Sequence, residues 1–297
     1  MALVNPAAGS GRGGLALTPI RRSLEERYAR FQVIEIPAAG ETAATARRVM
    51  RECPDRILIV GGDGTVSEAV HGFMDSEGPV PPFAVLPAGR GCDFARGLGL
   101  PANPDRILDC MEELPQPIDA GSQSKDGNVR YFVNIADAGL AGLVAHHSKR
   151  LAPMNLGGLL TYFLATSRAI FTRRSWPMTL KWDGGEDSGR FINVSVANGS
   201  HFGGGMHIAP AADAGDGMFD VVAIRSLGLI RIWSLIPYLY GGTLTSHPQV
   251  LHFRCRNLTI ESPESTPTEL DGEIGPVTPV TFTIHPSALR IYGVGKA

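Results

Sequence analysis

An apolar strand that runs into a glycine-flanked acid constrains the fold of this chain more than any other segment. Residues 57–68 read Ile-Leu-Ile-Val-Gly-Gly-Asp-Gly-Thr-Val-Ser-Glu. The run from Ile57 to Val60 is short, mostly β-branched and bounded by turn residues, which is typical of a strand buried in a sheet covered on both faces. Gly61 and Gly62 permit a sharp turn, and a helix is expected to begin at or near Thr65. The segment therefore predicts a strand, a tight turn and a helix.

The same layout suits a phosphate-binding loop. The N–H groups in the first turn of a helix have no partner within the helix, and they attract phosphate oxygens. Glycines let the backbone approach a ligand because no Cβ intervenes. Asp63 is a poor direct contact for phosphate because like charges repel, so its natural partner is a magnesium ion that bridges to a nucleotide. The alternative is a plain βα turn with Asp63 as a cap, since turn chemistry alone favours these residues.

Two textures divide the chain. Short apolar strands alternate with helical stretches up to about Pro117, which indicates βα units on a mainly parallel sheet. Beyond Pro117 the strand-like segments follow one another with turns between them, which indicates a β-rich second domain with helical insertions. The expected strands are 2–4, 31–36, 57–60 and 83–86 in the first region and 131–135, 190–197, 219–224, 257–260 and 280–284 in the second, and the expected helices are 15–28, 43–52, 66–74, 105–111, 159–171 and 229–239.

Composition and charge exclude several classes of protein. The chain has 297 residues, enough for one large or two ordinary domains, and a hydrophobic fraction of 43%, which is normal for a globular protein. A net charge of −2 gives no global field that would gather nucleic acid, so we expect no nucleic-acid partner. The four cysteines form no CxxC pair and no Cys/His ligand cluster, which fits a reduced, cytosolic compartment.

No segment predicts a membrane span. The residues up to Arg12 contain no hydrophobic segment, so we expect no signal peptide. The most apolar later stretches, 157–171 and 227–240, are interrupted by Arg168 and Arg231 and fall short of the roughly 20 residues that a span requires. We therefore expect a soluble or peripheral protein. Basic and aromatic residues flank these stretches, either as contacts for anionic headgroups or as a solvated face.

A second glycine motif offers a competing interpretation. Residues 9–14 read Gly-Ser-Gly-Arg-Gly-Gly and match the GxGxxG fingerprint of dinucleotide-binding folds, with Glu35 near the offset of a ribose-binding acid. This would make the chain a nicotinamide-dependent dehydrogenase. However, residues 5–8 separate the motif from its strand, Pro6 removes a backbone N–H at the turn, and the interpretation leaves Gly61 to Thr65 without a role. A lone GxGxxG is a weak signal.

Six motifs in a fixed order carry a resemblance that covers nearly the whole chain. They resemble the diacylglycerol kinase and sphingosine kinase superfamily of lipid kinases, most closely the soluble bacterial diacylglycerol kinase-like members. NAD kinase shares Gly-Gly-Asp-Gly-Thr, but its later asparagine- and glycine-rich pattern is missing here. The six motifs are Asn5-Pro-Ala-Ala-Gly9, Gly61-Gly-Asp-Gly-Thr65 with Glu68, Leu86 to Arg96, Gly203-Gly-Gly-Met206, Asp213 to Met218 and Asp271-Gly-Glu273.

The resemblance implies two domains with an active site in the cleft between them. Residues 1–117, joined by 288–297, would form an α/β nucleotide-binding domain like that of phosphofructokinase and NAD kinase. Residues 118–287 would form a β-sandwich acceptor domain with helical insertions. The implied reaction is ATP- and Mg²⁺-dependent transfer of the γ-phosphoryl group to a hydroxyl of diacylglycerol or a related lipid, in phospholipid biosynthesis. The implied location is cytoplasmic, with peripheral contact with the inner face of the membrane and a homodimer both permitted.

The resemblance also implies residue roles. Glu273 matches the general base, which must lie within hydrogen-bond reach of the attacking hydroxyl. Asp271 is the reserve candidate, because Gly272 between them suggests a turn. Asp63 would organise magnesium and water at the phosphates. The implied nucleotide-binding residues are Asn5, Pro6, Ala7, Ala8, Gly9, Gly61, Gly62, Asp63, Gly64, Thr65, Val66, Ser67, Glu68, Gly89 and Arg90, Asp93 would bind the substrate, and Asp213, Asp216 and Met218 would hold a second magnesium ion unless they form only an acidic turn.

Three positions depart from the pattern of the resembled family. Arg90 and Cys92 stand where Thr and Asn are usual, and Ile36 stands where a Thr is usual. Arg90 could supply a charge-assisted bond to phosphate, whereas the thiol of Cys92 is a weak hydrogen-bonding group. Two alternatives therefore stay open: a nucleotide-binding regulatory protein without turnover, and a kinase that acts on a soluble alcohol.

Overall fold

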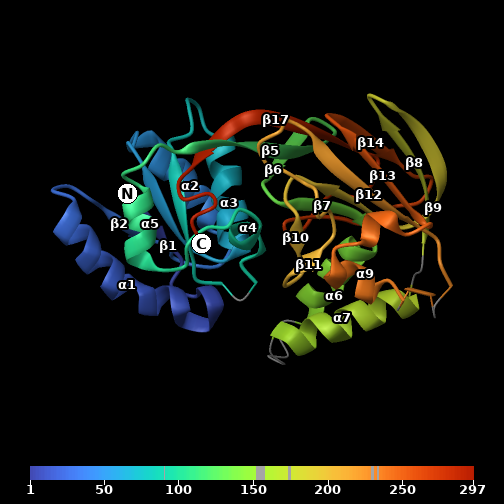
Figure 1. Ribbon diagram of the computed structural model, residues 1–297, viewed down its shortest axis with the longest axis horizontal. Coiled ribbons are helices and arrows are strands. Elements are labelled where there is room, and N and C mark those ends of the chain that lie inside the picture. The colour runs from blue at the N-terminus through green and yellow to red at the C-terminus, as the bar shows by residue number, and fades with distance from the viewer. Residues whose placement is uncertain (90, 152–157, 173–174, 229–230, 233) are drawn as a thin grey trace.

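The computed structural model describes residues 1–297 except 90, 152–157, 173–174, 229–230 and 233. Two lobes lie side by side (Figure 1): an α/β lobe built from the N-terminal third of the chain, and a β-rich lobe that carries helices on one side. Long strands pass between the lobes, so the two are joined by continuous hydrogen-bonded sheet. Among the described residues, no helix has both the length and the apolar character needed to cross a membrane.

The α/β lobe has a parallel sheet in the order β2-β1-β3-β4. Both faces are covered, because alternate residues of each strand pack into different cores: Ile57 and Ile59 of β3 enter one core, and Leu58 and Val60 enter the other. This agrees with the unbroken apolar run in the sequence. The elements are β1 (Ala2–Val4), α1 (Ala8–Arg27), β2 (Val33–Glu35), α2 (Thr42–Arg51), β3 (Ile57–Gly61), α3 (Asp63–Met74), β4 (Phe83–Pro87), α4 (Asp93–Gly97) and α5 (Pro104–Cys110).

The β-rich lobe closes around a core of aromatic and branched side chains. Phe132 stacks on Phe219 with ring centroids 5.8 Å apart, and meets Phe282 edge-on at 6.3 Å. The strands are β5 (Gln116–Lys125), β6 (Asn128–Phe132), β7 (Ile135–Gly139), β8 (Trp176–Trp182), β9 (Gly185–Ala197), β10 (His201–Phe202), β11 (Met206–His207), β12 (Phe219–Arg225), β13 (Val250–Cys255), β14 (Asn257–Glu261), β15 (Thr268–Leu270), β16 (Glu273–Ile274) and β17 (Val280–Ile291), and the helices are α6 (Leu140–Leu151), α7 (Gly158–Thr172), α9 (Ile236–Gly241) and the 3₁₀ turn η2 (Leu244–Ser246).

The last strand returns to the first lobe. β17 pairs antiparallel with β5 and β14, and its end reaches β4, where Ile291 pairs in parallel with Phe83. Figure 1 shows β17 arching from the β-rich lobe to the α/β lobe, with β5 running beside it. The two lobes are therefore fixed to each other by two adjacent strands, and a cleft can be lined from both sides.

The sequence-based strand at 131–135 is wrong as a single element. The structure has β6 ending at Phe132 and β7 beginning at Ile135. The cause is a carboxylate: Asp271 accepts the backbone N–H groups of residues 133, 134 and 135, which pulls this segment out of a regular ladder. The helix expected at 229–239 lies partly outside the described residues, and α9 covers Ile236–Gly241. Helix α6, which lines the cleft, was not expected.

Candidate active site

The first part of the site is the edge where β1 and β3 end. These strands are neighbours and parallel, so the loops that follow them meet at one edge of the sheet. Asn5 Nδ2 donates to Thr65 Oγ1 at 2.9 Å, and Asn5 Oδ1 accepts the N–H of Ala7 at 3.1 Å. The sequence-predicted segments 5–9 and 62–68 are thus tied to each other by side chains.

Glycines at this edge allow backbone segments to approach closely. Gly9 has φ of 59°, and a Cβ on it would lie 2.1 Å from the carbonyl oxygen of Ala88. A Cβ on Gly89 would lie 2.5 Å from the Cα of Gly62. Gly64 differs from these, because a Cβ there would meet nothing within 4 Å. Gly9 and Gly89 are required by packing, whereas Gly64 leaves open space at the start of helix α3.

A cavity of about 220 Å³ lies at this edge, in front of the N-terminus of α3. Within the described chain, Glu68 Oε2 is buried there without a hydrogen-bond partner, which marks it as a group awaiting a donor. Arg90 lies outside the described residues, and seven other residues predicted as nucleotide-binding do not line this cavity: Pro6, Ala7, Gly61, Asp63, Val66, Ser67 and Gly89. The cavity is lined by Asn5, Ala8, Gly9, Ala39, Gly40, Thr42, Gly62, Gly64, Thr65 and Glu68.

The residues missed at this cavity are Ala39, Gly40 and Thr42, in the loop after β2 and at the start of α2. A signal for them existed, since β2 lies beside β1 in the sheet and its loop must end at the same edge. Ile36, aligned with a family threonine, is instead 5% exposed within the apolar core. Its side chain therefore contributes packing rather than a polar contact.

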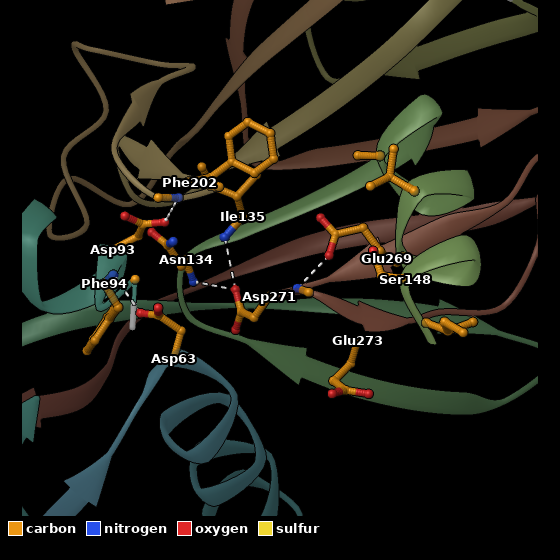
Figure 2. Close-up of a pocket in the computed structure, with 18 of the residues that line it drawn as sticks. Asp63, Asp93, Phe94, Asn134, Ile135, Ser148, Phe202, Glu269, Asp271 and Glu273 are labelled. Atoms are coloured by element: carbon orange, nitrogen blue, oxygen red, sulfur yellow. Dashed lines mark hydrogen bonds between the residues drawn. The ribbon is translucent and has the colours of Figure 1, made fainter. Parts of the chain in front are cut away.

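A larger cleft of about 600 Å³ lies between the lobes. The carboxylates of Asp63 and Asp93 from the α/β lobe and of Asp271 and Glu273 from the β-rich lobe all line it. Figure 2 shows Asp271 between the Asp63 and Asp93 side of the cleft and Glu269, with the Glu273 carboxylate directed away from Asp271. The acids that the sequence scattered over more than 200 residues are thus brought to one place.

Asp63 and Asp93 brace the α/β side of this cleft. Asp63 Oδ1 accepts the N–H of Phe94 at 3.0 Å, so it caps helix α4 from a distance, and burial raises the pKa of its carboxyl. Asp93 forms an ion pair with Arg96 and accepts the N–H of Gly204 at 2.6 Å, which ties α4 to the β10–β11 hairpin of the other lobe. Figure 2 shows both contacts.

Asp271 is fixed by hydrogen bonds. Its carboxylate accepts N–H groups from Val133 at 2.9 Å and from Asn134 and Ile135 at 3.0 Å each, and it also bonds the Ser67 hydroxyl of helix α3. Burial nevertheless raises the pKa of this carboxyl. Because its oxygens are occupied by four donors from both lobes, Asp271 acts as an anchor of the turn.

Glu273 is the contrasting acid of the same turn. It begins β16, pairs opposite Leu270 and faces the cleft. In the part of the chain that the structure describes, its carboxylate takes part in no hydrogen bond or ion pair. A carboxylate without fixed donors is available to accept a proton from a bound alcohol.

The second predicted magnesium position lies elsewhere. Asp213 and Asp216 line none of the cavities described above, and each accepts an N–H two residues on, from Gly215 and Met218, at 3.0 Å. Asp216 also pairs with Arg254. Among the described residues, no three His, Cys, Asp or Glu side chains lie close enough to hold a metal ion by themselves.

Cys92 stands where Asp63 and Gly89 meet. It has φ of 53° and precedes α4, its thiol is half-buried, and burial, with the Asp63 charge beside it, raises the thiol pKa. A Cβ on Gly89 would lie 3.2 Å from the Cys92 sulfur. The side chain thus packs behind the loop as a neutral thiol.

The other wall of the cleft was missed from the sequence. It is largely apolar and comes from β7, helix α6 and the β10–β11 hairpin, with one buried acid, Glu269, on β15. No short sequence motif predicts such a wall, because the residues that form it become neighbours only through the order of the strands in the sheet. These lining residues are Asn134, Ile135, Ala141, Val144, Ala145, Ser148, Lys149, Thr161, Phe202, Gly203, Gly204, Glu269 and Ile274.

A glycine loop at a helix N-terminus, facing carboxylates across an interlobe cleft, defines a phosphotransferase class of the NAD kinase-like fold. Residues 134–293 match the YegS C-terminal NAD kinase beta sandwich-like domain, and residues 1–123 match the diacylglycerol kinase catalytic domain. The chain belongs to this diacylglycerol kinase and YegS-like family of lipid kinases. The dehydrogenase interpretation of residues 9–14 is thereby set aside.

Individual relatives agree over the full length. A diacylglycerol kinase of Mycobacterium tuberculosis is 28% identical over 298 residues, covering 98% of this chain and 93% of that protein. A crystal structure from Bacillus anthracis, assigned as a diacylglycerol kinase, is 25% identical with a TM-score of 0.80 and covers 99% of this chain and 96% of that chain. An Archaeoglobus fulgidus NAD kinase in complex with ATP shares the fold, with a TM-score of 0.54 at 16% identity over 99% of this chain and 92% of that one.

Proposed function

We propose that this protein is an ATP- and Mg²⁺-dependent kinase that transfers the γ-phosphoryl group to a hydroxyl of diacylglycerol or a related lipid. The observation that carries the proposal is the larger cleft, in which the unpaired Glu273 carboxylate and the Asp63 end of the glycine loop face one cavity with an apolar wall. Nucleotide, base and lipid would each have a distinct surface there.

The nucleotide would occupy the smaller cavity and extend toward Asp63. Gly62 and Gly64 line the smaller cavity and Asp63 between them lines the larger one, so the loop separates the two. Backbone N–H groups at the start of α3 would bind phosphate oxygens, and Glu68 would accept a donor from the nucleotide. This placement directs the terminal phosphate at the cleft.

The residues near Asp63 fit a magnesium ion held chiefly by its substrate. Mg²⁺ is usually bound by one or two carboxylates together with water and substrate phosphates, and the Asp63 carboxylate lines the cleft beside the glycine loop. Asp63 is the carboxylate in reach of that position. When bound, the ion would neutralise phosphate charge during transfer. At the second predicted position, the carboxylate of Asp216 is occupied by Arg254, so a cation there would have to displace that side chain.

Glu273 would act as the general base. It would accept the proton of the attacking hydroxyl, while the anchored Asp271 holds the turn in place. Glu273 would thus be a carboxylic acid after the transfer, and it would regenerate its carboxylate by releasing the proton to solvent after product release. The hydrogen bonds that fix Asp271 argue against that residue as the base, since each would be weakened by protonation of its acceptor.

The apolar wall favours a lipid acceptor over a small soluble alcohol. Ile135 and Val144 lie in the wall together with Phe202, and burial of an acyl chain against such surface contributes about 25 cal/mol per Å². A peripheral contact with the membrane would bring such a substrate to the cleft. Phe171 on α7 and Tyr240 on α9 are exposed apolar side chains that suit such a contact.

Transfer from labelled ATP to a panel of diacylglycerols, monoacylglycerols, sphingoid bases and glycerol tests the proposal. We expect Mg²⁺-dependent labelling of a long-chain alcohol, and little labelling of glycerol at equal concentration. Labelling of glycerol alone would show that the acceptor is a soluble alcohol and not a lipid. ATP binding by calorimetry with no transfer to any acceptor, in folded protein, would favour the regulatory alternative. The cytoplasmic location and a homodimer stay predictions.

A further inference from the structure

Two fully buried acids face each other beside the catalytic turn. Glu269 of β15 and Asp137 of β7 are direct cross-strand partners in an antiparallel pair. Their residues are 4% and 0% exposed. Like charges directly opposite on neighbouring strands are destabilising, and two carboxylates buried side by side cannot both be ionised. One proton must therefore be shared between them.

The hydrogen bonds show which acid is ionised. Asp137 Oδ1 accepts the Ser195 hydroxyl and the Asn193 amide, each at 2.5 Å. Its other oxygen has no donor with a fixed hydrogen among the described residues, and the Asp137 carboxyl also bonds the carboxyl of Glu269. Burial raises the pKa of Asp137, but two donors on one oxygen stabilise its charged form, whereas the Asp137 charge raises the pKa of Glu269 further. Glu269 is thus the acid that carries the proton and donates it to Asp137.

Glu269 also holds the catalytic turn. Its Oε2 accepts the N–H of Gly272 at 2.5 Å, between Asp271 and Glu273, as Figure 2 shows. The same carboxyl lines the cleft. A group that is bonded on one side to a buried partner in β7 and on the other to Gly272 fixes the position of the turn relative to the sheet.

We propose that Glu269, kept neutral by the proton it shares with Asp137, is a positioning residue that sets the Asp271–Gly272–Glu273 turn for proton transfer. This rests on the proposed function of Glu273. The neutral state has a second consequence. The cleft already holds Asp63, Asp93, Asp271 and Glu273, so a further charge there would repel the phosphates of the nucleotide.

The surroundings of Glu269 favour the protonated form. Asp271 and Glu273 of the same hairpin, Asp63 and Asp93 on the opposite wall and Asp137 behind it are acids, and Lys149 on α6 is the one cation among the described residues that line the cleft. His147 on α6, which packs against β15, is buried, and burial lowers its pKa and keeps it neutral. Burial and Asp137 together raise the pKa of Glu269 well above its ordinary value.

Linkage then gives the direction of the pH effect. The folded chain holds the Glu269 proton at a pH where the unfolded chain has released it. Folding is therefore most favoured below the ordinary glutamate pKa and weakens as pH rises toward the raised one, by up to tenfold in the folding equilibrium per pH unit. Glu269→Gln cannot ionise, and it keeps a donor for Asp137 and an acceptor for Gly272. It should remove that pH dependence.

The first experiment compares infrared spectra and unfolding of full-length wild type, Glu269→Gln and, as a matched control, Glu261→Gln on β14, where the half-exposed carboxylate pairs with Lys181 outside the cleft. We expect a carbonyl band of a protonated carboxylic acid at neutral pH in wild type and Glu261→Gln, with a reduced band in Glu269→Gln. Midpoints of unfolding should fall from pH 5 to pH 9 more steeply in wild type than in Glu269→Gln. An unchanged band, or equal slopes, overturns the shared proton.

The second experiment measures turnover and amide exchange. We expect Glu269→Ala to lower kcat by tenfold to about 100-fold with little change in KM, and to speed hydrogen exchange at Gly272. Glu269→Gln should recover at least tenfold of that loss and extend activity to higher pH than wild type. Glu269→Gln with no recovery overturns the positioning role. If wild type phosphorylates no alcohol, the kinase proposal fails, while the infrared band and Gly272 exchange still decide the state of Glu269.

Discussion

The two sides of the cleft differ in the groups that they offer to a ligand: one side offers backbone groups and the other offers side chains. On the α/β side the proposed ligands are mainly backbone groups, presented by glycines and a helix N-terminus at the edge of a parallel sheet. On the β-rich side they are carboxylates, held at different depths by donors from neighbouring strands. The first arrangement depends on close backbone approach, whereas the second depends on which carboxylate is left without donors. Mutations on the two sides should therefore affect different properties: nucleotide affinity on the α/β side, and turnover or stability on the β-rich side.

The largest effect should come from the unpaired carboxylate. Glu273→Gln removes the proton acceptor, and we expect turnover to fall by a factor on the order of 10² to 10⁴ while ATP affinity stays within a few-fold. Rates with saturating ATP and lipid, together with calorimetry of ATP binding, measure both quantities. Glu261→Gln, at a half-exposed side chain of β14 that pairs with Lys181 outside the cleft, should match wild type in both quantities. A rate unchanged in Glu273→Gln would exclude Glu273 as the base.

A smaller effect, and one on stability, should come from the anchored acid. Asp271→Asn places an amide N–H against donors from Val133, Asn134 or Ile135, so one buried donor loses its acceptor. We expect the free energy of unfolding to fall by about 1 to 3 kcal/mol. Turnover should fall as well, because the turn that carries Glu273 loses its anchor. Denaturant unfolding in parallel with rates tests this, and a loss of rate with full stability would return Asp271 to the role of base.

These two acids show how far sequence reasoning reaches. The glycine loop could be predicted because strand, turn and helix N-terminus are contiguous at residues 57–68, and the resemblance brought in Asp271 and Glu273. The two acids differ in role because Asp271, unlike Glu273, accepts the N–H groups of residues 133–135. The sequence could not predict this difference, because it indicates a single strand over that segment. Glu269 was missed for the same reason: its partner Asp137 becomes its neighbour only through the pairing of β15 with β7.

On the α/β side of the cleft, adding a single methyl group tests whether backbone groups bind the phosphates. Gly64→Ala places a Cβ in open space at the proposed phosphate position, in the first turn of α3. We expect nucleotide affinity to fall by roughly tenfold, which corresponds to about 1.4 kcal/mol. Stability should hold or rise, since Ala is favoured over Gly in a helix by about 1 kcal/mol. Gly14→Ala in α1, where a Cβ makes ordinary contact, is the control for calorimetry and should bind ATP as wild type does. Equal affinities would move the phosphates away from α3.

The smallest effect should come from the acidic loop outside the cleft, where two interpretations differ. As a turn, Asp216 bonds Met218 N–H and a half-exposed Arg254, so Asp216→Asn should change the free energy of unfolding by less than about 1 kcal/mol. As a magnesium site, the loop would stabilise wild type by about 2.7 kcal/mol at a Mg²⁺ concentration 100 times the dissociation constant, and Asp216→Asn would lose that gain. The carboxylates of Asp213 and Asp216 already accept N–H groups of the turn, and Asp216 also pairs with Arg254. We therefore expect the smaller change in the free energy of unfolding. Thermal unfolding without nucleotide, in millimolar Mg²⁺ and in EDTA, separates the two. A Mg²⁺-dependent rise in wild type that Asp216→Asn abolishes would show that this loop, like the β-rich side of the cleft, binds its ligand through side chains.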